Sequence, residues 1–66
     1  MNTTLVKTHS ATDGAAILRN TEAHSTAIRP IVCYAMDADT IVISGCNADE
    51  AAAIIDGTDA TILETR

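Results

Sequence analysis

Cys46 is the residue of this chain with the clearest potential for covalent chemistry. It precedes a predicted helix capped by Asn47, and a helix N-terminus can lower the pKa of a thiol and make it a nucleophile. A base should then lie nearby, but only His24 is expected at the same end of the fold. Asp49 and Glu50 follow within four residues, and their negative charge raises the pKa of a thiol. We therefore interpret Cys46 as a structural thiol, and we expect no catalytic residue and no enzymatic activity.

The two histidines and two cysteines do not have the spacing of a metal site. They occur in the order His9, His24, Cys33, Cys46. Structural zinc sites draw their ligands from close pairs such as C-x₂₋₄-C, and no such pair is present. The segment Asp37-x-Asp39 resembles the start of an EF-hand loop, but Val42 stands where that loop needs glycine. With no glycine-rich phosphate loop either, the sequence indicates neither a metal nor another cofactor.

The acidic residues are distributed unevenly along the chain. Seven of the nine lie between residues 37 and 64, so residues 37–66 carry a net charge of −6 with Arg66 as their only cation, whereas residues 1–36 carry +1. Charge asymmetry of this kind bears on partners and encounter rates more than on the fold. Turn formation, helix dipoles and solubility explain acidic residues equally well. The candidate partner-binding residues are Asp13, Asp37, Asp39, Asp49, Glu50, Asp56 and Asp59.

The hydrophobic pattern predicts four strands and two helices. The strands are predicted at residues 3–8, 27–36, 40–44 and 58–64. The helices are predicted from Ala11 to Asn20 or Ala23, and from Ala48 to Asp56. Ser10 opens the first helix in a capping-box pattern, Asn47 caps the second, and Gly57 follows it in the position of a left-handed residue. Because Pro30 cannot donate to a ladder, the second strand should lie at a sheet edge or begin after the proline.

The resulting β-α-β-β-α-β order predicts one α+β domain over residues 1–66. It is typical of the ferredoxin-like, split-βαβ arrangement, in which two helices cover one face of a four-stranded antiparallel sheet. A different α+β arrangement of the same elements stays open. In the ferredoxin-like arrangement five carboxylates share one end: Asp13, Asp37, Asp39, Asp56 and Asp59. Asp49 and Glu50 lie at the other end, and Asp56 is expected in a last helical turn, where the helix dipole opposes it.

The composition excludes several classes of partner. Tyr34 is the only aromatic residue and acid is in excess, so a stacking platform in a basic groove for single-stranded nucleic acid is not expected. Anionic membranes call for clusters of Lys and Arg, which the chain lacks. No apolar run has the length of a signal peptide or of a membrane span, so we expect a cytoplasmic protein with two free thiols.

Several overall features together point to one class of proteins. These are the length of 66 residues, the pI near 4.5, the lack of a catalytic motif, and the acids Asp37, Asp39, Asp49, Glu50, Asp56 and Asp59 on a compact body. This profile resembles the small acidic phage-encoded anti-CRISPR proteins that inhibit by DNA mimicry. The resemblance implies a partner in the bacterial cytoplasm, a Cas protein or surveillance complex, blocked at its DNA-recognition surface.

Two other interpretations stay open beside this one. The sheet face away from the helices would expose part of Val32, Tyr34, Met36 and Val42, an apolar patch suited to a homodimeric structural or regulatory module. Alternatively, the chain is a thiol enzyme or redox carrier that uses Cys46.

Overall fold

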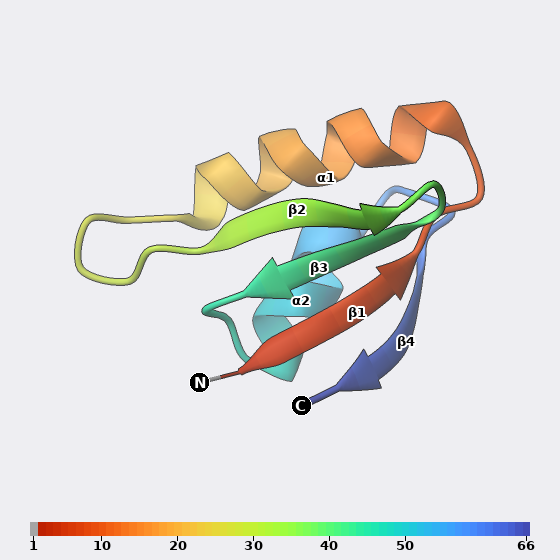
Figure 1. The fold of residues 1–66 in the computed structure, drawn as a ribbon. Coiled ribbons are helices and arrows are strands. Elements are labelled where there is room, and N and C mark those ends of the chain that lie inside the picture. Colours follow the sequence, from red (N-terminus) through yellow and green to blue (C-terminus); the bar gives the residue numbers. More distant parts are fainter. Residues whose placement is uncertain (1) are drawn as a thin grey trace.

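The computed structural model describes residues 2–66 and has the predicted order of elements (Figure 1). The strands are β1 (Thr3–Lys7), β2 (Val32–Asp37), β3 (Thr40–Ser44) and β4 (Thr61–Thr65), and the helices are α1 (Ala11–His24) and α2 (Ala48–Ile55). The strands form one antiparallel sheet in the order β2-β3-β1-β4, and both helices lie on the same face of it. The predicted ferredoxin-like fold class is therefore confirmed, with β2 at an edge and Pro30 before its first residue.

Several predicted boundaries differ from the structure, some by a single residue. The first helix runs on to His24. The predicted strand 27–36 begins only at Val32, because a loop held between Thr26 and Arg29 occupies its first residues: Thr26 N–H donates to the Arg29 carbonyl, and Arg29 N–H donates to Thr26 Oγ1. The predicted strand 58–64 begins at Thr61, because Thr58 forms a turn in which its hydroxyl donates to the Ile55 carbonyl.

The second helix is bounded as its sequence predicts, with one correction. Asn47 Oδ1 accepts from Glu50 N–H at 2.8 Å, and Glu50 Oε1 accepts from Asn47 N–H at 3.3 Å, which completes a capping box. Gly57 has the left-handed φ of +82° expected after the helix. Asp56, however, is the C-cap residue with an extended backbone and lies outside the last helical turn. Its position beside the negative end of the dipole therefore needs less explanation than a helical position would.

The core is a thin aliphatic layer between the helices and the sheet. Its buried members are Val6, Ile17, Ile31, Ile43, Cys46, Ala51, Ile54 and Ala60. Val6, Ile17, Ile43 and Ile54 are completely buried, and burying a side chain of this size stabilises the fold by roughly 1.5–3 kcal/mol. Within residues 2–66, no helix has the length and apolar character needed to cross a membrane.

Gly45 allows the chain to pass from β3 into α2. Its φ is +99°, and a Cβ atom at this position would lie 2.5 Å from the Pro30 carbonyl oxygen. Only glycine combines that backbone conformation with so close an approach. The contact fixes the segment before β2 against the start of α2, and it places Cys46 in the core.

Candidate functional site

Three connections meet at one end of the domain. Lys7, the last residue of β1, pairs with Thr40 at the start of β3 and with Thr61 at the start of β4. Thr8 N–H then donates to the Asp39 carbonyl at 2.8 Å, which joins the β1–α1 connection to the β2–β3 turn. These connections and the ends of the elements that they join carry Asp13, Asp37, Asp39, Asp56 and Asp59, and we call this region the acidic end.

Asp13 has a structural role at the acidic end. Its side chain is buried, and it accepts hydrogen bonds from the N–H groups of His9 (2.9 Å), Ser10 (3.2 Å) and Asp59 (3.3 Å). These bonds, the one from His9 first, hold the pKa of Asp13 below its usual value because they favour the ionised form. The carboxylate therefore joins the β1–α1 connection to the α2–β4 connection and is not available to a partner.

Asp37 and Asp39 shape the β2–β3 turn and stay exposed. Asp37 Oδ1 accepts from Asp39 N–H at 3.2 Å, and this bond lowers the pKa of Asp37. Asp39 Oδ1 accepts from the Thr40 hydroxyl at 3.3 Å. Both carboxylates have solvent-facing lone pairs left over, since each can accept about four hydrogen bonds.

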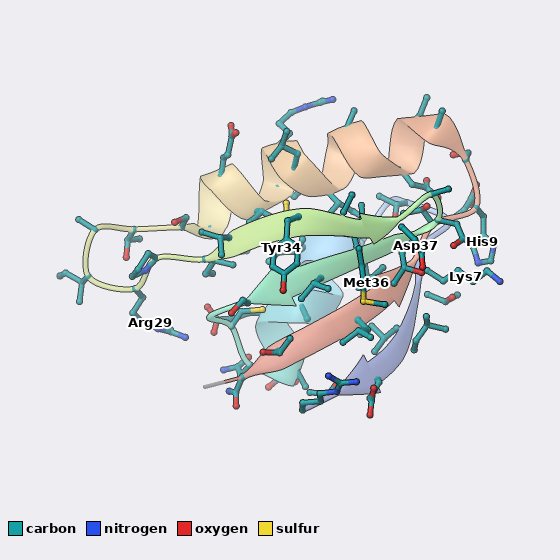
Figure 2. The ribbon with its side chains drawn as sticks, in the orientation of Figure 1. Lys7, His9, Arg29, Tyr34, Met36 and Asp37 are labelled. Carbon is teal, nitrogen blue, oxygen red and sulfur yellow. The ribbon has the colours of Figure 1, made fainter. Side chains whose placement is uncertain are left out.

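Asp56 and Asp59 are the acids of this end that are most available to a partner. Both residues are exposed, and neither side chain makes a hydrogen bond or ion pair within residues 2–66. Figure 2 shows Lys7 and His9 near Asp37 at the same end. Four exposed carboxylates thus face one lysine, so the end keeps an excess of negative charge.

Asp49 and Glu50, the pair predicted at the other end of the fold, have different environments in the structure. Glu50 forms an ion pair with Arg29 and completes the cap of Asn47. The hydrogen bond from Arg29 is the main reason why the pKa of Glu50 is lowered. Asp49 is exposed and unpaired within the described part of the chain. Glu50 is therefore occupied by local structure, and of the predicted pair only Asp49 is left for a partner.

Cys46 does not have the properties of an activated thiol. It is 1% exposed, and burial, reinforced by the charge of Glu50, raises its pKa. Both properties are the reverse of what a thiol nucleophile needs. Cys33 is also a free thiol and is half-buried. Residues 2–66 bring no three His, Cys, Asp or Glu side chains together as a metal site would require.

A groove between α1 and β2 was not predicted from the sequence. This apolar cavity of about 250 Å³ is lined by Gly14, Leu18, Cys33, Tyr34, Ala35 and Ile41. Gly14 faces Ile41 without a Cβ, and Leu18 one turn later stays half exposed. A glycine inside a helix, four residues before a leucine, is the one sequence signal that could have indicated a groove on this side of the helix.

Comparisons of this chain with protein-family models, with curated proteins and with solved structures found no significant match.

Proposed function

We propose that this chain is a small protein-binding module whose acidic end docks on a basic surface of another protein. The observation that carries the proposal is the gathering of exposed, largely uncommitted carboxylates on three connections that meet at one end. The net charge of −5 gives the whole molecule the same sign as this end. A surface that normally holds nucleic-acid phosphates is the best electrostatic match, because its Lys and Arg side chains are already placed for spaced negative charges.

The narrower form of the proposal is inhibition by DNA mimicry. The acidic end would occupy the DNA-recognition surface of a Cas effector complex in the cytoplasm of a bacterial host, as the resemblance to small acidic anti-CRISPR proteins implies. The supporting features are the carboxylates of Asp39, Asp56 and Asp59, which lie on separate segments around the same end.

Neutralising the uncommitted acids tests the proposal. In the triple variant Asp39→Asn, Asp56→Asn, Asp59→Asn, capture of basic proteins from a bacterial lysate at low salt should fall at least about tenfold, since several charge-assisted contacts are lost together. Capture by the unchanged chain should fall similarly in about 1 M NaCl, where screening acts within a few ångströms. Each captured protein would then be purified and its affinity measured directly.

A second triple variant provides the matched control. Glu22→Gln, Asp49→Asn and Glu64→Gln remove the same amount of charge from exposed sites away from the acidic end. This control should bind as the unchanged chain does. Equal losses in both triple variants would show that net charge alone drives capture and would refute a role for the acidic end.

The narrower form needs its own measurement. Purified CRISPR effector complexes, mixed with the chain, should lose binding of their target DNA in an electrophoretic mobility assay. Mixed instead with the Asp39→Asn, Asp56→Asn, Asp59→Asn variant, the complexes should bind their target DNA as they do alone. A complex that bound the chain yet still bound DNA would exclude mimicry while leaving a basic docking surface intact.

A further inference from the structure

β2 is an edge strand (Figure 1), and the alternation of hydrogen bonds in an antiparallel sheet decides which of its backbone groups point outward. Between β1 and β3, Gly45 N–H donates to the Asn2 carbonyl at 3.0 Å, and Thr8 N–H donates to the Asp39 carbonyl at 2.8 Å. The register between these two pairs is unbroken. The odd-numbered residues of β3 therefore bond to β1, and the even-numbered ones are left to bond to β2.

This alternation leaves two residues of β2 with unpaired backbone groups. Tyr34 pairs with the even-numbered Val42, so these two exchange hydrogen bonds. Cys33 and Ala35, on either side of Tyr34, therefore turn their N–H and C=O groups away from the sheet, and within residues 2–66 no group outside the sheet bonds to them. Val42 was predicted to be partly exposed, but it is buried, because it lies between Tyr34 and Leu5 of the neighbouring strands.

The edge is protected at both ends but not in the middle. Ile31, the preceding odd-numbered residue, donates its N–H to Ser25 Oγ at 2.9 Å, and a bulge between Ala35 and Asp37 interrupts the other end. Exposed edges are commonly protected by lysine or proline, but β2 contains neither, and its only charge is that of Asp37. Two N–H and two C=O groups thus stay open to an extended backbone.

Apolar side chains flank these open groups on both faces of the sheet. On the helix side, Cys33 and Ala35 line the apolar groove of about 250 Å³, together with Leu18 of α1, which is half exposed. On the other face, Tyr34 and Met36 are 57% and 55% exposed, and Figure 2 shows both side chains away from the helices. A strand added at this edge would therefore find apolar neighbours above and below its backbone.

We propose that β2 is the docking edge for an extended segment of another protein, which pairs with it as an antiparallel strand. Cys33 and Ala35 each exchange two hydrogen bonds with one residue of that segment. Directly paired residues share a face, so these two partner side chains enter the groove and are aliphatic. The amino-terminal end of the segment passes Asp37, where a basic residue matches the only charge of β2.

A second copy of this chain fits the edge less well than such a segment. In an antiparallel pair of two β2 strands centred on Tyr34, the copy would place its own Ala35 and Cys33 in the groove positions. These side chains are too small to fill a groove of about 250 Å³, and β2 has no cation to meet Asp37. The strand pairing does not rest on the docking function proposed for the acidic end.

Hydrogen exchange measured by NMR tests the pairing directly. The probe is the peptide acetyl-Lys-Val-Thr-Val-Thr-amide, whose valines lie opposite Ala35 and Cys33 and whose lysine lies beside Asp37. In the free chain, the amides of Cys33 and Ala35 should exchange at least about tenfold faster than that of Tyr34, which is bonded within the sheet. Peptide at about 5 mM should shift the resonances of both amides and slow their exchange at least about threefold.

Two N-methylated peptides separate main-chain pairing from side-chain contact. N-methylation of both valines removes the N–H groups that donate to the Cys33 and Ala35 carbonyls, so binding should weaken at least about tenfold. N-methylation of both threonines removes N–H groups that point away from β2, so it should change binding little. The two peptides have the same composition, and their difference isolates the hydrogen bonds.

Proline variants make the same comparison in the protein. Ala35→Pro removes an outward N–H of β2 and should weaken peptide binding at least about fivefold. Thr65→Pro is the matched control on the other edge strand, β4: Arg66 exchanges hydrogen bonds with Thr3 of β1, so the neighbouring Thr65 N–H points outward, and peptide binding should not change. Circular dichroism melting would confirm that both variants are folded.

A pair of glutamine variants tests the groove. Leu18→Gln places a polar group where the partner's aliphatic side chains should pack, so peptide binding should weaken at least about threefold. Ile28→Gln is the control, because Ile28 is 92% exposed and lies outside the groove.

Four results would overturn the proposal. The first is slow exchange of the Cys33 and Ala35 amides in the free chain, which would mean that the edge is already paired. The second is no binding of the probe peptide up to about 5 mM. The third is equal binding of the two N-methylated peptides, which would reduce the contact to side chains. The fourth is protection that grows with the concentration of the chain alone, which would assign the edge to a second copy.

Discussion

At the scale of single residues, the structure assigns different roles to residues of the same type. Thr4 and Thr21 are both buried, but the Thr21 hydroxyl donates to the Ile17 carbonyl at 2.7 Å, whereas Thr4 Oγ1 has no hydrogen-bond partner within residues 2–66. Among the carboxylates, Asp13 is buried and accepts three hydrogen bonds, one of them from the backbone N–H of Asp59. The side chain of Asp59 itself is exposed and makes no hydrogen bond within residues 2–66. Residue type alone therefore does not say which acid or hydroxyl is available for function.

Thr4→Val should stabilise the protein. Valine has the same shape and removes a buried hydroxyl that has no partner in the described chain, so the free energy of unfolding should rise by about 1 kcal/mol. Urea denaturation would measure the change. Thr21→Val is the control, and it should be neutral or destabilising by up to about 1 kcal/mol, because it gives up a hydrogen bond that is made. A Thr4→Val variant less stable than Thr21→Val would show that the Thr4 hydroxyl makes a hydrogen bond in the folded protein.

At the scale of elements, two glycines with positive φ join the second half of the fold. Gly57 follows α2, and no atom of residues 2–66 lies within 4 Å of the place that a Cβ would take there. Gly45 leads into α2 and is pressed against the Pro30 carbonyl. Gly57 therefore meets a conformational requirement alone. Gly45 also keeps the loop before β2 against the start of α2, and so places the edge strand.

Gly45→Ala should be much more costly than Gly57→Ala. At Gly57 the expected loss is about 1–2 kcal/mol, the penalty of a left-handed residue with a Cβ. At Gly45 the same penalty applies, and a contact at 2.5 Å with backbone must also be relieved, so the loss should exceed about 3 kcal/mol. Chemical denaturation of both variants gives the comparison. Equal losses would mean that the β3–α2 connection can move away from the Pro30 carbonyl without a cost in free energy.

At the scale of the whole molecule, the exposed acids of the connections gather at one end of a small domain. The acidic end is formed where three connections meet. Asp13 links two of the connections, so the acidic end depends on a buried carboxylate for its shape. We infer that docking through the acidic end is salt-sensitive.

Asp13→Asn should lower the melting temperature at pH 7, because an amide has one acceptor oxygen and its NH₂ group would face at least one of the three backbone N–H donors. The pKa of Asp13 is lowered in the folded state, so its stabilisation is present above the ordinary value of 3.8 and is lost as the pH falls through the folded pKa. The difference in melting temperature between the two proteins should therefore shrink in acid. A difference that stayed constant down to about pH 2 would contradict this role for the ionised carboxylate.

Local sequence patterns were enough to predict the order of elements, the caps of both helices and the edge position of β2. These features depend on residues within about four positions of one another, as in the capping box of Asn47 and Glu50, or on the period of a strand. The loop before Val32 was missed because its bonds between Thr26 and Arg29 compete with an apolar run that is typical of a strand.

Which acids are free, in contrast, depends on tertiary packing. Asp13 meets the N–H of Asp59 across 46 positions, and Arg29 meets Glu50 across 21. No local pattern encodes such pairs, because they form only when separate elements pack. The seven acids predicted to bind a partner are thereby divided into two residues held by the fold, Asp13 and Glu50, and five that remain exposed.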